Sequence, residues 1–152
     1  MVSDLRIRWS RLMLPAALAA AAAVSLSAQG AMASKSSDVL ATVRLSRPTM
    51  ADGQALAAGT YAVRVSDAAV TPAAGESPDS EKWVEFVQAG TVKGREIASV
   101  LVGPAVKEVA KGAPPASGHA RVELLNGNQY LRVWINHGGT NYLVHLAVAP
   151  GK

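Results

Sequence analysis

Apolar and polar residues alternate in short segments along most of the chain after residue 38. Between residues 60 and 66, for example, Tyr61, Val63 and Val65 share one face of an extended chain, and the residues between them share the other. Glycine, proline, asparagine and aspartate separate the segments, as expected for reversals between strands. Strands are therefore expected at residues 39–45, 60–66, 82–89, 95–102, 119–125, 129–136 and 141–149, with a short one at 55–58.

This succession of short strands predicts an all-β fold, namely a single antiparallel β-sandwich or flattened barrel of about seven strands. Residues 67–81 have two prolines, four acidic groups and no periodicity, which is typical of a surface loop. Residues 104–111 place Val106, Val109 and Ala110 at positions i, i+3 and i+4 behind a proline, so one or two helical turns are expected there.

The last three strands form a meander whose pairing can be derived from its turns. A two-residue turn at Gly138-Gly139 supplies the positive φ angles that a tight hairpin needs. This turn places Arg132 opposite His145 and Trp134 opposite Leu143.

The preceding hairpin allows two registers. A turn centred on Gly127-Asn128 sets Glu123 against Arg132 and Arg121 against Trp134, whereas a turn centred one residue earlier sets Arg121 against Arg132. Opposite charges and a cation over an indole favour the first register, and like charges disfavour the second. The core face then consists of Val122, Leu124, Leu131, Val133, Ile135, Tyr142, Val144 and Leu146.

The first 33 residues follow the order of a secretory signal peptide. Three arginines within the first eleven residues precede an apolar run from Leu12 to Leu26. Small residues at positions 31 and 33 predict cleavage before Ser34, and Ala28 is a second candidate end. The chain is thus expected to comprise a signal peptide at residues 1–33 and a single β-sandwich domain at residues 34–152.

An uncleaved membrane anchor is the alternative, because basic residues precede the apolar run. The run has 15 residues, however, and a membrane-spanning helix needs about 20. The chain has no cysteine, which excludes both disulfides and a lipid anchor on cysteine. We therefore expect a periplasmic or secreted protein of the bacterial envelope, with no stable membrane anchor after cleavage.

Charge says little about partners. Of the formal net charge of +4, the first 33 residues contribute two, so the remainder carries about +2. The sequence has no run of lysine and arginine that would form a basic surface for nucleic acid, so no nucleic-acid partner is expected. An envelope protein or a glycan remains a candidate partner.

One group of side chains could carry acid–base chemistry. The predicted register aligns Glu123, Arg132 and His145 across three strands, beside Arg121 and Trp134. A carboxylate near an imidazole can tune its pKa, and an arginine can hold an anion. The alternative is a solvated sheet face with one ion pair, because an open sheet face does not exclude water.

Motifs for nucleophilic catalysis are absent from the sequence, which has no G-x-S-x-G, no phosphate-binding loop and no H-E-x-x-H. The three histidines, His119, His137 and His145, are not at a spacing characteristic of metal ligands. We expect neither an enzyme nor a bound cofactor or metal. Trp83, Trp134 and Tyr130 could form a stacking surface if they are exposed.

The segment from Gly53 to Val63 resembles the L-x-A-G-T-Y hairpin of small exported bacterial β-sandwich proteins of unknown function. Leu56, Gly59 and Tyr61 match that pattern. The resemblance implies a sandwich with the tyrosine anchored in the core, and it implies no functional residue.

The sequence thus predicts an exported, non-enzymatic binding or structural accessory module. Its possible binding face consists of Arg121, Glu123, Arg132, Trp134 and His145. The alternatives are a small-ligand carrier with a barrel cavity and an envelope enzyme that uses Glu123, Arg132 and His145.

Overall fold

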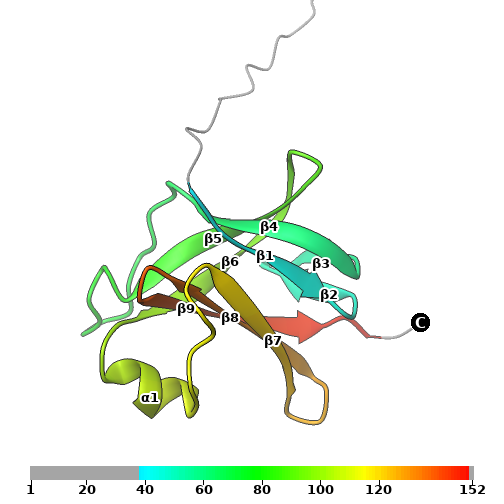
Figure 1. Cartoon of the computed structure of the whole chain (residues 1–152). Coiled ribbons are helices and arrows are strands. Elements are labelled where there is room, and N and C mark those ends of the chain that lie inside the picture. The colour runs from blue at the N-terminus through cyan, green and yellow to red at the C-terminus, as the bar shows by residue number, and fades with distance from the viewer. Residues whose placement is uncertain (1–37, 151–152) are drawn as a thin grey trace, which may run out of the picture. The chain divides into compact units, whose positions relative to one another are not determined.

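A computed structural model describes residues 38–150, which form an antiparallel β structure with one short helix (Figure 1). The predicted signal peptide lies outside the described residues. The elements, in chain order, are β1 (Val39–Leu45), β2 (Thr49–Ala51), β3 (Gln54–Leu56), β4 (Gly59–Val65), β5 (Glu81–Gln88), β6 (Thr91–Leu101), α1 (Ala105–Ala110), β7 (His119–Leu125), β8 (Tyr130–His137) and β9 (Thr140–Val148).

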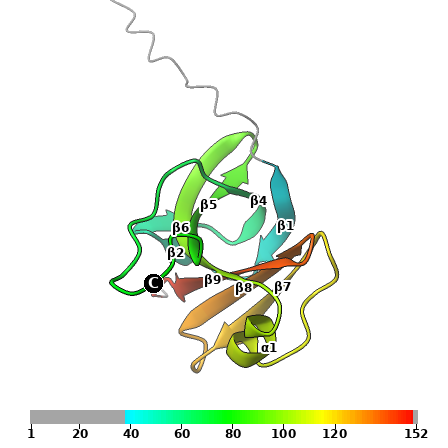
Figure 2. The ribbon, with the colours of Figure 1, turned by 90° about the vertical axis from the view of Figure 1, so that its left-hand side faces the viewer.

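Seven strands form one curved antiparallel sheet in the order β1-β4-β5-β6-β9-β8-β7. The two end strands, β1 and β7, come to lie side by side, so the sheet is a nearly closed barrel (Figures 1 and 2). Of the two architectures expected from the sequence, the barrel is therefore correct. The short β2–β3 hairpin extends the sheet where Thr49 and Met50 pair with the end of β9.

Side chains fill the interior of the barrel. Tyr61 and Phe86 meet edge to face with their ring centroids 6.2 Å apart, and the Tyr61 hydroxyl donates a hydrogen bond to the Ala57 carbonyl (2.8 Å). The predicted core face of the meander is confirmed except for Leu124, which is 39% exposed. The fully buried side chains of this core are Leu45, Leu56, Val63, Val84, Phe86, Leu131, Val133, Ile135, Val144 and Leu146.

A second, smaller apolar cluster lies outside the barrel. Helix α1 packs Val106 and Ala110 onto Trp134 and Leu143, which point outward from β8 and β9. The helix lies where the sequence predicts it and ends where Lys111 adopts a left-handed conformation (φ 50°), but Val109 of the predicted apolar face is 54% exposed. Helix α1 therefore covers part of the outer face of the sheet.

Two details of the strands differ from the sequence-based expectation. Strand β2 was not expected, because three residues after a proline have no period of their own; they become a strand by pairing with β3 across the turn at Asp52 and with the end of β9. Strand β6 begins at Thr91 rather than at residue 95, because the turn is confined to Ala89 and Gly90, which both have positive φ. Gly94, which was expected in the turn, lies within the strand.

Gly94 allows the β2–β3 hairpin to pack closely against β6. A Cβ atom at this position would lie 3.1 Å from Leu56 Cδ2 and 3.4 Å from the Ala51 Cβ, and both neighbours are fully buried. Alanine stabilises the fold by about 0.4–1 kcal/mol because it lowers the conformational entropy of the unfolded chain. Overpacking at a crowded site, in contrast, destabilises the fold by about 1–3 kcal/mol. We expect Gly94→Ala to lower the free energy of unfolding by about 1 kcal/mol.

Urea denaturation measures this change. Gly112→Ala is the matched control, because Gly112 also lacks a positive φ and its added Cβ would make an ordinary contact of 3.5 Å. Equal stabilities of the two variants would contradict the close packing of the hairpin on β6.

Candidate functional site

The predicted row of Glu123, Arg132 and His145 lies on the outer face of β7, β8 and β9. Arg132 is the register partner of Glu123 on one side and of His145 on the other. Arg121 is opposite Trp134, as the favoured register of the hairpin requires. The predicted pairing of the meander is therefore confirmed.

Both carboxylate oxygens of Glu123 are engaged by arginines. Arg132 donates to Glu123 Oε2 from Nε (2.9 Å) and also from Nη2. Arg121 Nε lies 2.9 Å from Glu123 Oε1, close enough for an ion pair but not aligned for a hydrogen bond. The carboxylate is thus shared between two cations.

Trp134 is fully buried, in contrast to the predicted exposed face around it. Its ring lies under α1 and has the guanidinium carbons of Arg121 and Arg132 at 4.7 and 5.7 Å from the ring centroid. Its Nε1 donates to Asn141 Oδ1 (2.8 Å), which satisfies the buried N–H group. Trp134 is therefore unavailable for stacking on a ligand, because the helix occupies its outer side.

Arg132 connects the sheet to the helix. Besides its bonds to Glu123, it donates from Nη1 to the carbonyl oxygen of Ala110 (3.4 Å), the last residue of α1. A cation at this end of a helix compensates the unpaired carbonyl groups. Each of the three guanidinium nitrogens donates within the protein, so the geometry is that of a structural clamp.

His145 lies at the exposed side of the same row. Partial burial and, secondarily, the positive charge of Arg132 lower the pKa of its imidazole below 6.5. Arg132 separates it from Glu123 in the register, so the imidazole has a cation as its neighbour instead of a carboxylate. The arrangement therefore favours a neutral imidazole on this face.

A hollow of about 420 Å³ opens beside His145 at the end of the β7–β8 hairpin. Leu125, Asn126 and Tyr130 line it together with His145. Tyr130 is 40% exposed, and the turn that holds Asn126 is formed by three consecutive residues with positive φ. The hollow offers an aromatic ring and an amide from the β7–β8 hairpin and an imidazole from β9.

The outer face is thus divided into a covered half and an open half. Trp134 and Leu143 lie in the half under α1, and Tyr130 and His145 lie in the open half. The alternation of β8 places Tyr130 and Trp134 on one face, but the sequence has no signal for which of them the helix covers. The contribution of Leu125 and Asn126 to a site was missed for the same reason.

The other aromatic and histidine candidates lie apart from this hollow. Trp83 points outward from β5, is half-buried, and carries the Arg95 guanidinium 4.4 Å from its ring centroid. His119 Nδ1 is 3.1 Å from the Ser117 carbonyl oxygen, and His137 Nδ1 is 3.3 Å from that of Leu40. Within residues 38–150, no group of three or more potential metal ligands comes together.

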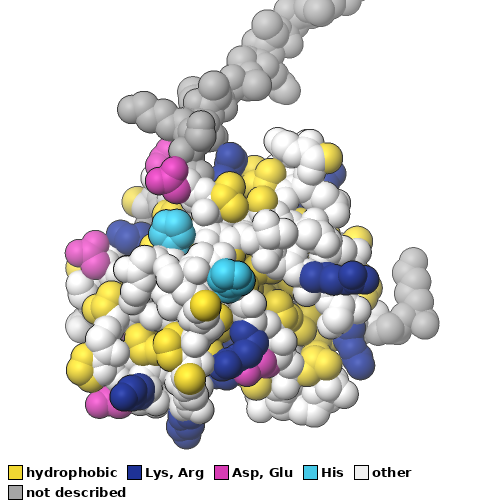
Figure 3. Space-filling view, viewed as in Figure 1, with side chains coloured by type: hydrophobic (Ala, Val, Ile, Leu, Met, Phe, Trp, Pro, Cys, Tyr) yellow, Lys and Arg dark blue, Asp and Glu magenta, His cyan; other side chains and the backbone are white. Residues whose placement is uncertain are grey.

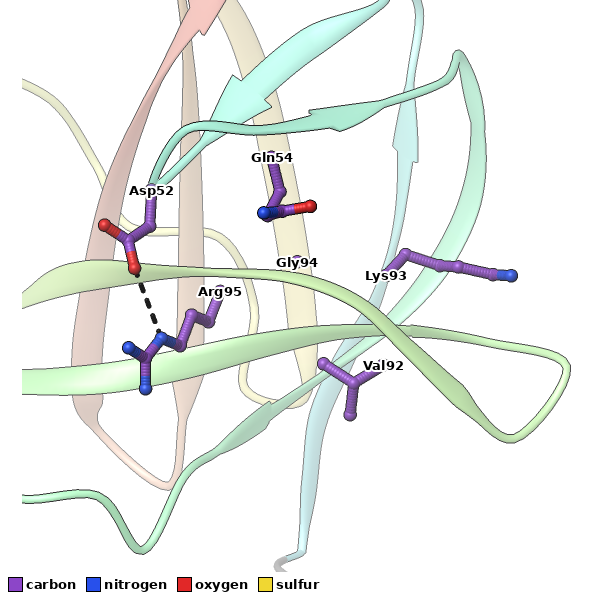
Figure 4. A pocket seen from close by; sticks show the side chains of 6 residues that line it. All are labelled: Asp52, Gln54, Val92, Lys93, Gly94 and Arg95. Carbon is purple, nitrogen blue, oxygen red and sulfur yellow. Dashed lines mark hydrogen bonds and ion pairs between the residues drawn. The ribbon is translucent and has the colours of Figure 1, made fainter.

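A second surface hollow, of about 340 Å³, lies between the β2–β3 turn and β6 (Figure 4). Two of its charged side chains are paired with each other, since Arg95 Nε lies 3.2 Å from Asp52 Oδ2, whereas Lys93 forms no ion pair with another described residue. The Asp52 amide donates to Glu96 Oε2 (2.8 Å). These contacts hold the turn against the strand and explain the shape of the hollow without a ligand.

No protein-family model matches the chain, and no curated protein or solved structure is significantly similar to it. The part of the chain that the structure describes contains no helix with the length and apolar character needed to cross a membrane.

The lowered pKa of His145 predicts a pH dependence of stability. The unfolded imidazole, with a pKa near 6.5, takes up a proton before the folded one does. The contribution of His145 to the free energy of unfolding is therefore present above pH 6.5 and is lost as the pH falls through the lower pKa of the folded state. In His145→Gln, we expect a flatter pH dependence in this window.

The pKa can be measured directly by following the His145 ring protons in an NMR titration, alongside urea denaturation of both proteins. A pKa at or above 6.5, or an unchanged pH profile in His145→Gln, would contradict the partial burial of the ring beside Arg132.

Proposed function

We propose that this protein is an exported, non-enzymatic binding module, and that the hollow lined by Leu125, Asn126, Tyr130 and His145 is its ligand site. The observation that carries the proposal is that Tyr130, which is 40% exposed, lines the hollow beside an imidazole whose protonation is disfavoured. The order of charged, apolar and small residues in the first 33 positions supports export to the periplasm or beyond.

The chemistry of the hollow suits a neutral, hydroxyl-rich ligand. An exposed tyrosine ring packs against the apolar face of a sugar, while an amide and a neutral imidazole exchange hydrogen bonds with hydroxyl groups. No acidic side chain lines this hollow. A sugar unit of an envelope glycan is therefore the ligand class that we propose.

The two alternative functions have less support. An enzyme would use Glu123 and Arg132, but these side chains are engaged with each other, with Arg121 and with α1. A carrier would need an apolar cavity of about 300 Å³ or more. Fully buried side chains from β1, β3, β4, β5, β8 and β9 occupy the interior of the described barrel instead.

Titration of the full chain with N-acetylglucosamine oligomers, followed by ¹⁵N–¹H NMR, tests the ligand site. We expect amide shifts confined to the β7–β8 turn and the strand around His145. Tyr130→Ala should weaken binding about three- to tenfold, the range expected for loss of an aromatic contact. Val92→Ala, which truncates another exposed apolar side chain (42%), is the matched control.

The absence of shifts at millimolar oligomer, or equal binding by Tyr130→Ala and Val92→Ala, would overturn the ligand site. Export is tested separately by expressing the full chain in a bacterium and sequencing the N-terminus of the product in the envelope and culture medium. A product that begins at Ser34, or directly after Ala28, supports export, and an intact chain in the cytoplasm overturns it.

A further inference from the structure

Among residues 38–150, the two ends of the barrel sheet leave two neighbouring strand edges without partners. Of the described strands, β1 pairs only with β4, and β7 pairs only with β8. These strands lie side by side, but no backbone hydrogen bond within residues 38–150 joins them. We call the facing edges of Val39–Leu45 and His119–Leu125 the seam.

The seam is closed at one end. The His137 ring nitrogen, at the end of β8, lies 3.3 Å from the carbonyl oxygen of Leu40. Leu40 also interrupts the β1–β4 register between Val39 and Ala41, and such a bulge disfavours further pairing. The start of β7 lies next to the end of β8, so both strands begin at this closed end.

Toward the other end, the seam is open on the β7 side. Leu124 belongs to the core face and is the register partner of the fully buried Leu131, yet it is 39% exposed. Val122, on the same face, is only partly buried. On β1, in contrast, Val43 and Leu45 are buried. The accessible apolar surface therefore follows β7, and Figure 3 shows hydrophobic side chains between the two strands.

The open end is positively charged. Arg44 near the end of β1 and Arg47 just after it are exposed, and neither forms an ion pair with another described residue. Basic side chains are visible where β1 ends in Figure 3. An edge-to-edge contact between two copies of this chain would bring these cations toward each other, so the charge disfavours self-association through β1.

We propose that the open end of the seam binds an extended segment of another polypeptide, which adds as a strand to the free edge of β7. Main-chain hydrogen bonds to β7 supply affinity, an apolar side chain covers Leu124, and an acidic group pairs with Arg44 or Arg47. The added strand would extend the barrel sheet at the point where it is incomplete. The hollow beside Tyr130 opens on the outer face of the β7–β8 hairpin, whereas Leu124 lies on its core face, and the two sites adjoin at Leu125 at the end of β7.

The test uses the full chain and a synthetic peptide of alternating valine and serine that ends in two aspartates. Fluorescence anisotropy measures binding, and NMR amide exchange locates it. We expect alternate amides of β7 to exchange about tenfold more slowly with the peptide bound. The same peptide with N-methyl groups on alternate amides should not bind, because it cannot form the ladder.

The proposed pairing of an acidic group with Arg44 or Arg47 is tested with a second peptide that ends in two lysines. The aspartate peptide should bind about three- to fivefold more tightly than the lysine peptide, as expected for exposed ion pairs. Arg44→Glu should reverse this preference. Lys93→Glu is the matched control, since Lys93 is an exposed lysine on β6 with no ion pair among the described residues. It should retain the preference of the original protein.

Three results would overturn the proposal. The first is equal binding of the N-methylated peptide, which would exclude a main-chain ladder. The second is the absence of binding at millimolar aspartate peptide, and the third is slowed exchange confined to elements other than β7.

Discussion

Replacing Trp134 with alanine is expected to lower the free energy of unfolding by about 3–5 kcal/mol, the range for truncating a buried aromatic side chain. Trp134 is the largest fully buried side chain, and it forms the floor on which Val106 and Ala110 of α1 pack. Its loss leaves a cavity under the helix. It also removes the indole N–H group that donates to Asn141 Oδ1. The helix should therefore loosen from the sheet in this variant.

Urea denaturation gives the size of the effect, and hydrogen exchange of the α1 amides shows whether the helix loosens. Trp83→Ala is the control, because Trp83 is half-buried on another part of the outer surface and should cost less. A cost for Trp134→Ala no greater than that for Trp83→Ala would mean that α1 does not cover this ring in solution.

Replacing Arg132 with methionine is expected to cost about 2–4 kcal/mol, as found when one partner of a largely buried ion pair is removed. The Arg132 side chain is 15% exposed and donates to both Glu123 and the Ala110 carbonyl. Methionine keeps part of the packing over Trp134 but supplies no donor. Glu123 then retains only Arg121 as a cationic neighbour.

Urea denaturation measures this cost too, with Arg95→Met as the control. The Arg95 side chain is 49% exposed in its ion pair with Asp52, so its replacement should cost no more than about 1 kcal/mol. An independent measurement is the pKa of His145, which should rise in Arg132→Met because the charge of Arg132 lowers it. An unchanged pKa, or equal costs for the two variants, would argue against Arg132 as the link between sheet and helix.

The two variants also separate structure from ligand binding. Trp134 and Arg132 stabilise the covered half of the outer face, whereas Tyr130 and Leu125 line the open half. Tyr130→Ala should therefore leave the free energy of unfolding almost unchanged while it weakens glycan binding. Loss of binding without loss of stability is the signature of a ligand-contacting residue.

Local pattern was sufficient for much of this fold. Period-two alternation identified every strand longer than three residues, and the charges around Gly127-Asn128 selected the register that pairs Glu123 with Arg132. These features depend on neighbours within one hairpin, where turn geometry and cross-strand pairs fix which side chains face each other. The row of Glu123, Arg132 and His145 and the short helix were predictable for the same reason.

Only the tertiary structure decided which side chains on each face of the sheet are covered, and by what. The sequence indicates a helix before β7 but not that its Val106 and Ala110 cover Trp134, because the path of the connecting loops has no local signal. Strand β2 pairs locally with β3, but its place in the barrel sheet depends on pairing with β9, nearly 100 positions later in the chain. Leu124 follows the core pattern, yet it is exposed because β1 and β7 do not form a ladder at the end of the barrel. Periodicity determines the face on which a side chain lies, and only long-range packing determines what covers that face.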